Sequence, residues 1–328
     1  GQLRIPLKQP TLKAGSEYHL NVSFCLAEDT AWADKGHIIA SQQFALPWQT
    51  TAETKLLMSH AKLLATDTSA TLRLVAPGFA LEFRKSTGMP KLLNYNGEEV
   101  LTSEIKPNFY RSRLDNDNWC YNEWDRAGFD HLNVDAKDFR FNQISANRVE
   151  VSASVVSRPE HWRDNPQILH MKWTIDSSGR IECAVTYEKV KGLDNMPRVG
   201  FTFQADDSLQ DWTWFGRGPF ENYRDRNRSA HVGIYKKSVA GMTEPYVKPQ
   251  ENGNRTDVRW AKLSNNAGNG IKINSIGAPL NMKAIPHTDL DLQKADYSNE
   301  LPKPGRTFVY IDAAHMGLGN SSCGPRPM

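Results

Sequence analysis

The chain has 328 residues, enough for two domains or one large all-β domain, and its net charge of +3 is spread along the sequence. It has no Lys/Arg run typical of a nucleic-acid or membrane-surface patch, and no stretch near the roughly 18 apolar residues of a membrane span. Because Cys25, Cys120, Cys183 and Cys323 form no C-x-x-C pair, structural zinc is not expected, and reduced thiols in a cytoplasmic protein are the default interpretation.

Alternation of apolar and polar residues begins near the N-terminus. From Tyr18 to Leu26, every second residue is apolar, which predicts a β-strand. The stretch 47–56 breaks the pattern, so that residues 1–50 form a short block of about two strands. Since an isolated hairpin is only marginally stable in water, we expect this block to be the end of a domain whose beginning is missing.

From residue 57 onward the same alternation predicts many antiparallel strands. Predicted strands at 71–76 and 79–84 flank Pro77-Gly78, and Asn96-Gly97 is a further turn signal. The remaining predicted strands are 148–157, 168–176, 180–188, 198–205, 230–236, 256–263, 269–275 and 307–312. Strands at this spacing with irregular connections are typical of an antiparallel sandwich, so the predicted fold class is all-β.

Helical signals are nearly absent. Thr288 followed by Asp291 resembles a capping box that would open a short helix at 288–296, with a loop as the alternative.

The densest polar cluster is 113–126. Asp115-x-Asp117 lacks the Gly and closing Glu of a calcium loop, and alternate carboxylates on a strand would point to opposite faces. A solvated or ligand-facing loop is therefore the better interpretation. Trp119 and Trp124 lie among its Asp and Asn side chains, where each could pack in a core or stack on the apolar face of a sugar ring.

Other candidate motifs are incomplete. Gly216 and Gly218 suggest a phosphate loop, but the G-x-x-x-x-G-K-[ST] pattern is absent, and Gly317 and Gly319 lack the third glycine of a dinucleotide site. The histidines show no metal-ligand spacing. The residues alone thus predict a β-sandwich with aromatic and polar loops and no catalytic set.

Five runs nevertheless occur in the order seen in one family. They are Ala31-Trp-Ala-Asp-Lys-Gly-His37, Arg113-Leu-Asp-Asn-Asp117, Trp214-Phe-Gly-Arg-Gly-Pro-Phe-Glu-Asn-Tyr-Arg-Asp225, Pro249-Gln-Glu-Asn-Gly-Asn-Arg255 and His315-Met-Gly-Leu-Gly319. Together they resemble the C-terminal third of the large β-galactosidases of glycoside hydrolase family 2, the lacZ type, across nearly the whole chain.

The resemblance implies two domains. Residues 1–50 would be the C-terminal part of an immunoglobulin-like sandwich, the fourth domain of such an enzyme. Residues 57–328 would be the large fifth-domain sandwich, similar to galactose mutarotase, with its closing strands missing after Met328.

The resemblance also implies that this chain has no catalytic residue. The family hydrolyses terminal β-D-galactosides such as lactose with retention, using two glutamates on a (β/α)8 barrel that lies N-terminal to everything in this sequence. Mg²⁺ and Na⁺ are expected in that catalytic domain, and no cofactor in this chain. The expected partners are the barrel and N-terminal domains of the same enzyme, the galactoside, and further copies in a homo-oligomer. The expected location is cytoplasmic.

Site residues follow only from the resemblance. In the family a tryptophan near the end of this domain stacks on the sugar, and Cys323 stands at that position here. The loop after Asp117 also lies near the active site, with a small residue where this chain has Trp119. The implied substrate-binding residues are Asn116, Asp117, Trp119, Trp124 and Cys323. We hypothesise that Trp119, together with Trp124, supplies the stacking that Cys323 cannot.

Two alternatives stay open. The chain could be the natural small subunit of a two-chain β-galactosidase. It could also be an independent sugar-binding or mutarotase-like module, which would need a catalytic His and Glu in one cleft, and no such pair stands out in the sequence.

Overall fold

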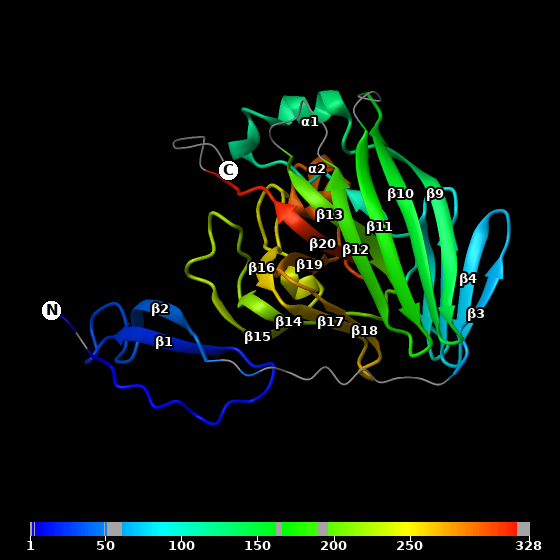
Figure 1. The fold of residues 1–328 in the computed structure, drawn as a ribbon. Helices are drawn as coiled ribbons and strands as arrows, with labels where there is room; N and C mark the ends of the chain where they lie inside the picture. The colour runs from blue at the N-terminus through cyan, green and yellow to red at the C-terminus, as the bar shows by residue number, and fades with distance from the viewer. Residues whose placement is uncertain are drawn as a thin grey trace. The chain divides into compact units, whose positions relative to one another are not determined.

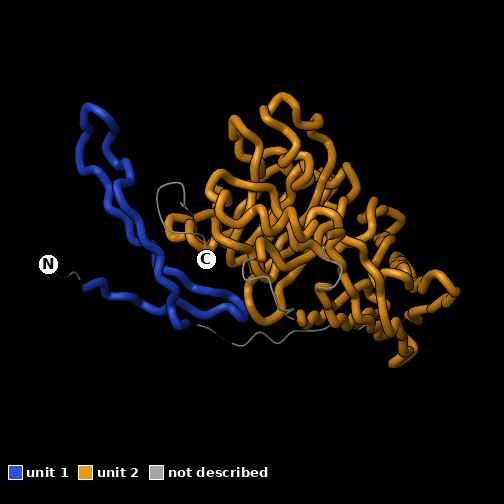
Figure 2. Tube along the Cα trace, turned by 90° about the horizontal axis from the view of Figure 1, so that it is seen from above, with its two compact units in different colours: residues 1–57 blue, residues 58–328 orange. Residues whose placement is uncertain are grey.

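The structure is a computed structural model that describes residues 2, 4–48, 50, 61–161, 166–188 and 196–319. The chain divides into two compact units, residues 1–57 and residues 58–328, which Figure 2 shows in different colours. Each unit is described by itself below.

Unit 1 contains one antiparallel hairpin. Strand β1 (Tyr18–Cys25) pairs with β2 (Ile38–Leu46), with Tyr18 opposite Leu46 and a register shift near Cys25. The period-two pattern therefore predicted β1 correctly.

The described part of unit 2 is built from four antiparallel sheets (Figure 1). The first sheet consists of β3 (Leu64–Asp67), β4 (Thr71–Ala76), β5 (Phe79–Arg84), β6 (Met89–Tyr95) and β7 (Glu98–Glu99). The second consists of β9 (Leu132–Ser145), β10 (Arg148–Pro159), β11 (Gln167–Asp176) and β12 (Ile181–Glu188).

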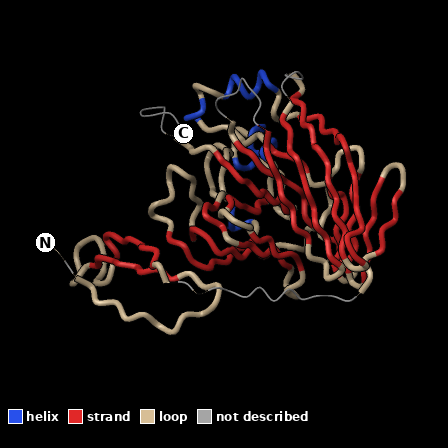
Figure 3. Tube along the Cα trace, in the orientation of Figure 1, coloured by secondary structure: helices blue, strands red, loops and turns tan. Residues whose placement is uncertain are grey.

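The other two sheets border three of the family-like runs: one strand contains residues 214–218, another begins at Arg255 and a third ends at His315. In spatial order, one consists of β16 (Arg255–Val258), β19 (Leu280–Ile285), β20 (Thr307–His315), β13 (Arg198–Ala205) and β8 (Lys106–Asn108). The other consists of β15 (His231–Ser238), β14 (Asp211–Gly218), β17 (Trp260–Ser264) and β18 (Gly270–Asn274). Figure 3 shows how strongly strands dominate the chain, and the prediction of an all-β fold is confirmed.

The core follows directly from the alternation. Along β10 every second residue from Val149 to Val155 is buried, and the residues opposite them on β11 are buried as well. Phe83 of β5 meets Trp173 of β11 edge to face, with ring centroids 5.8 Å apart, which joins the first two sheets in one core.

The short helix α2 (Asp289–Lys294) confirms the capping-box prediction. Thr288 is its N-cap: the Thr288 hydroxyl accepts from the Asp291 amide at 3.0 Å, and the Asp291 carboxylate accepts from the Thr288 amide at 2.9 Å.

The expectation of a loop throughout 113–126 is wrong. Asp115–Asp117 form a 3₁₀ turn, η1, and Tyr121–Ala127 form helix α1, which ends at Gly128 in the left-handed conformation (φ 73°). Helix α1 has Cys120 at its N-cap with no side-chain cap, so it carries no starting signal. It forms because Trp124 and Ala127, one turn apart, are both buried.

No helix among the described residues is long and apolar enough to cross a membrane.

Candidate functional site

Four of the five family-like runs meet in unit 2. The 113–117 run contacts the 315–319 run through Asn116, whose Nδ2 donates to the Gly319 carbonyl at 2.8 Å. The 214–225 run contacts the same segment through Asp225, whose carboxylate accepts from the amides of Leu318 (3.1 Å) and Gly319 (2.7 Å). Segments far apart in the sequence are therefore joined by direct hydrogen bonds.

The 249–255 run is mostly buried and contacts the 214–225 run. The Tyr223 hydroxyl donates to Glu251 Oε1 at 3.2 Å, and the Asn222 amide donates to the Asn254 carbonyl at 2.9 Å. The Asn254 side chain donates back to the Asn222 carbonyl at 2.9 Å. Asn222 and Asn254 thus fix the two runs to each other through a reciprocal pair of hydrogen bonds.

Glu251 lies at the centre of a buried ionic cluster. Its Oε1 accepts from Lys283 Nζ at 2.7 Å and its Oε2 accepts from Arg198 Nη2 at 3.2 Å, and all three residues are 0% exposed. Burial alone would raise the pKa of Glu251, but the charges of Lys283 and Arg198 outweigh burial and hold that pKa well below its usual range. Glu251 is therefore a carboxylate at neutral pH.

Arg198 serves two further acids of the cluster. Its Nη1 donates to Asp289 Oδ2 at 3.1 Å, and its Nε lies 3.2 Å from Asp312 Oδ2. Burial raises the pKa of Asp312 to about 7, although the charge of Arg198 opposes this shift. Burial, together with the neighbouring carboxylates of Glu251 and Asp289, therefore favours the protonated form of Asp312.

His315 completes the cluster as a neutral imidazole. Its Nδ1 donates to the Met316 carbonyl at 2.7 Å, and its Nε2 accepts from Arg198 Nη2 at 3.1 Å. Burial lowers the pKa of His315 to about 4, even though Glu251, 3.6 Å away, favours the protonated form. The cluster is charge-compensated and closed, which is the arrangement of a structural centre.

The structure places the sequence-predicted site residues as follows. Asp117 is completely buried, and its two oxygens accept from Arg111 Nη1 and Nη2 at 2.8 Å each. Trp124 is 0% exposed, with the Arg111 guanidinium 5.3 Å from its ring centre. Trp119 is half-buried and packs against the core. Cys323 lies outside the described residues.

The structure therefore brings Asn116, Asp117, Trp119 and Trp124 together in one segment and sets that segment against 315–319. Of the two tryptophans, Trp119 alone keeps part of its side chain exposed.

Sequence reasoning missed the ionic cluster. Its members come from β13, the 249–255 run, β19, α2 and β20, and no local pattern links them. The available signal was weak: Glu251 lies in a polar run that reads as a turn, and Lys283 occupies an apolar strand.

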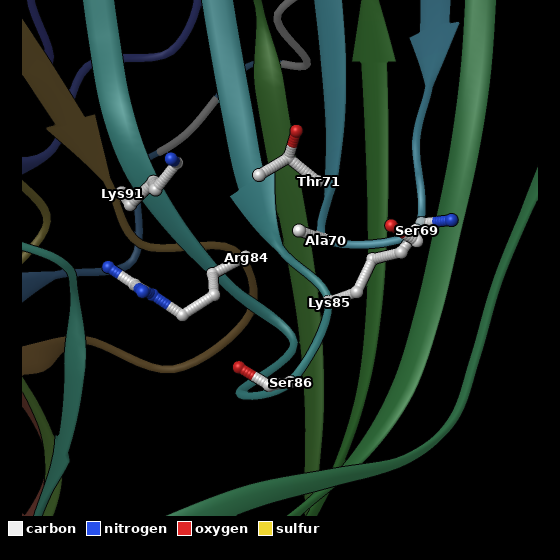
Figure 4. A pocket seen from close by; sticks show the side chains of 7 residues that line it. All are labelled: Ser69, Ala70, Thr71, Arg84, Lys85, Ser86 and Lys91. Carbon is white, nitrogen blue, oxygen red and sulfur yellow. The ribbon is translucent and has the colours of Figure 1, made fainter.

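One open pocket, of about 440 Å³, lies elsewhere in unit 2, and Figure 4 shows the side chains that line it. Its cations are already paired: Arg84 with Glu104 at 2.8 Å, and Lys91 with Glu82 at 2.8 Å. Lys85 is paired with an acid as well. The pocket is not a candidate site, because an anionic ligand would have to displace these acids. Among the described residues no group of three or more His, Cys, Asp or Glu is arranged to hold a metal ion.

Comparisons with known proteins agree with the resemblance. The family described as beta galactosidase small chain matches residues 75–328, and β-galactosidase, domain 4, matches residues 1–47. A β-galactosidase of Vibrio cholerae is 32% identical over 333 residues, covering 97% of this chain and 31% of that protein. A β-galactosidase of Priestia megaterium is 29% identical, covering 92% of this chain and 29% of that protein.

A β-galactosidase of Psychromonas ingrahamii is 30% identical and covers 94% of this chain and 30% of that protein. The chain spans about a third of the length of the curated relatives it matches. Because the small-chain match extends over well more than half of the sequence, this chain belongs to the β-galactosidase small-chain family.

Proposed function

We propose that this chain is the C-terminal, non-catalytic region of a retaining β-galactosidase of glycoside hydrolase family 2. It supports the catalytic barrel and lends the 113–126 segment to the mouth of the active site. The proposal is supported by the names of the relatives and by the fraction of their length that the chain spans. The substrates are terminal β-D-galactosides such as lactose.

The absence of catalysis in the chain itself is supported by the state of its acids. A retaining glycosidase needs two carboxyl groups about 5–5.5 Å apart on either side of an accessible bond. In unit 2 the gathered carboxylates of Glu251, Asp289 and Asp312 are nearly fully buried and face Arg198 and Lys283. They are committed to charge compensation, so hydrolysis would depend on glutamates of the barrel.

One contact carries the proposal of a contribution to the active site. The hydrogen bond from Asn116 to Gly319 joins the two segments that the family resemblance assigns to the active-site mouth. Segments that are joined in this way could both face one bound sugar. Mg²⁺ and Na⁺ would bind in the catalytic domain, the assembled enzyme would be a cytoplasmic homo-oligomer, and the chain would need no cofactor.

The test is the hydrolysis of o-nitrophenyl β-D-galactoside by the purified chain, with and without the polypeptide encoded immediately upstream. We expect no hydrolysis by the chain alone and clear hydrolysis after the upstream polypeptide is added. The matched control is the upstream polypeptide by itself, which should be inactive. Robust hydrolysis by the chain alone would overturn the proposal.

A two-chain enzyme is a second candidate, favoured by the description of the matching family as a small chain. Rescue by the upstream polypeptide as a separate chain, at ordinary concentrations, would favour it. Rescue only when the two are covalently joined would favour a single-chain enzyme.

The mutarotase-like alternative is weakened by geometry. The structure does bring a His–Glu pair together, with His315 Nε2 3.6 Å from Glu251 Oε1. Both side chains are buried, and both ring nitrogens of His315 already have protein partners. A sugar could reach this pair only if the cluster opened. Interconversion of α- and β-galactose by the purified chain would restore this alternative.

A further inference from the structure

Asp225 lies at the tip of a tight turn that is anchored in the interior. The Tyr223 amide donates to the Arg226 carbonyl at 3.2 Å, and the Arg226 amide donates to the Tyr223 carbonyl at 2.8 Å. Tyr223 is 1% exposed, its hydroxyl bonds Glu251, and its ring lies 5.4 Å from that of His315. The buried cluster thus fixes the turn from which the exposed Asp225 projects.

From this turn Asp225 holds the segment after His315. Its two oxygens accept separately, Oδ1 from the Leu318 amide and Oδ2 from the Gly319 amide. The approach requires Gly317, because a Cβ on Gly317 would lie 2.4 Å from Asp225 Oδ2. Hydrogen bonds from backbone amides to a carboxylate are charge-assisted and about twice as strong as neutral ones. Asp225 therefore sets the position of the peptide that ends at Gly319.

That peptide in turn supports the segment that bears Trp119. The Gly319 carbonyl accepts from Asn116, in the middle of η1, and the Gly317 carbonyl accepts from Arg111 Nη2 at 3.4 Å. Arg111 also forms a bidentate ion pair with Asp117 at the end of η1. A continuous path of hydrogen bonds leads from Asp225 through Gly319 to η1, and Trp119 follows η1 by two residues.

We propose that Asp225 is a positioning residue for galactoside binding, acting on the Trp119 segment through Gly319. The proposal rests on the proposed function, since it assigns Asp225 a role in an active site that the assembled enzyme would complete. Asp225 does not touch the sugar. It holds the 317–319 peptide so that Asn116 and η1 present Trp119 in one orientation.

The test uses the enzyme assembled from this chain and the upstream polypeptide. Asp225→Asn keeps the shape of the side chain but turns one amide N–H toward a backbone N–H, so one of the two hydrogen bonds is lost. We expect KM for o-nitrophenyl β-D-galactoside, and Ki for isopropyl β-D-thiogalactoside, to rise about 3- to 10-fold, with kcat within about twofold of wild type. In the same variant, amide hydrogen exchange at Leu318 and Gly319 should accelerate.

The matched control is Asp211→Asn. Asp211 is the first residue of β14, the strand that leads toward the Asp225 turn, and its carboxylate pairs with the exposed Lys236 at 2.7 Å. We expect its KM, Ki and amide exchange at 318–319 to equal those of wild type. Melting temperatures of both variants should stay near wild type, which separates positioning from general loss of structure.

A second variant tests the path itself. Asn116→Ala removes the next link, so its KM should rise in the same direction, and the double variant should show no more than the larger single effect. Fully multiplicative effects, or a wild-type KM in Asp225→Asn, would overturn the inference. If the wild-type assembly shows no activity at all, the proposed function fails instead, and the two failures are distinguishable.

Discussion

Lys283 Nζ lies 2.7 Å from Glu251 Oε1, and both side chains are completely buried. An amine and a carboxylate withdrawn from water in this way are tolerated only because each compensates the other. Glu251 also accepts hydrogen bonds from Arg198 Nη2 and from the Tyr223 hydroxyl. The pair therefore fixes where the 249–255 run sits against β13 and β19, and with it the turn that carries Asp225.

The first prediction concerns the charge of Glu251. Glu251→Gln preserves the shape of the side chain but leaves Lys283 and Arg198 with one anion fewer in a dry interior. We expect a loss of about 3–5 kcal/mol in the free energy of unfolding. Urea unfolding followed by tryptophan fluorescence measures it. Lys236→Met, which breaks an exposed pair with Asp211, is the control and should cost no more than about 1 kcal/mol. Equal losses in the two variants would contradict this account.

The second prediction concerns pH, where two buried groups act with opposite signs. Burial raises the pKa of Asp312 to about 7, from about 3.9 in an unfolded chain. Its stabilising contribution is fully present below about pH 4 and is lost as pH rises through about 7. Burial lowers the pKa of His315 to about 4, from about 6.5 unfolded. Its contribution is present above about pH 6.5 and is lost as pH falls through about 4.

In wild type these two contributions oppose each other over the shared window, between about pH 4 and 6.5. Asp312→Asn should leave the pH dependence that His315 contributes unopposed. The free energy of unfolding should then rise with pH by up to about 1.4 kcal/mol per pH unit between about pH 4 and 6.5. His315→Gln should expose the opposite slope. Urea midpoints across this range measure both slopes. The prediction fails if both variants keep the wild-type dependence.

The sequence predicted those elements whose signals are local. Strands β4 and β5 carry a clear alternation on either side of Pro77-Gly78, and their observed bounds match the predicted ones. Helix α2 was recognised because Thr288 and Asp291, three residues apart, suffice to define a capping box. In each case the energy that decides the conformation comes from neighbours along the chain.

The elements that were missed depend on distant partners. Strand β14 alternates between buried and half-buried residues, but two of its inward positions are Gly216 and Gly218, so it reads as a loop. A Cβ on Gly218 would lie 2.7 Å from the Tyr235 ring, and a Cβ on Gly216 would lie 2.9 Å from the Val258 Cα, so each glycine leaves room for a neighbour that is distant in sequence. Helix α1 packs its Trp124 ring against the Arg111 guanidinium, which is distant in sequence, and its N-cap residue Cys120 makes no side-chain capping hydrogen bond.

The third prediction concerns Gly200, where β13 meets β20 at a register shift. A Cβ there would lie 2.1 Å from Asp312 Oδ1 and 2.4 Å from the Ile311 carbonyl oxygen, and the second atom belongs to the backbone of a central strand. Gly200→Ala should therefore destabilise the chain by about 3 kcal/mol. Gly241→Ala is the control, because its Cβ would meet only the Ser238 hydroxyl, at 3.1 Å. Urea unfolding of the two variants should separate them clearly, and similar midpoints would contradict the packing argument.

The fourth prediction separates the two tryptophans of the 113–126 segment. Trp119 is half-buried and lies two residues after η1, whereas Trp124 is fully buried and its ring packs against the Arg111 guanidinium. If Trp119 stacks on the sugar, Trp119→Ala in the assembled enzyme should raise KM for galactosides by about 3- to 10-fold, since an aromatic contact contributes about 0.5–1.5 kcal/mol. It should cost less stability than Trp124→Ala, because Trp119 is only half-buried.

Trp124→Ala is its matched counterpart, with the opposite pattern expected. Removing a fully buried indole should cost about 3–5 kcal/mol of stability, while the molecules that remain folded keep the wild-type KM. Steady-state kinetics and urea unfolding of both variants test the pair together. A KM that is unchanged in Trp119→Ala would exclude Trp119 as the stacking residue. A raised KM in folded Trp124→Ala would show that the core beneath the segment, rather than the exposed edge of Trp119, controls the fit of the sugar.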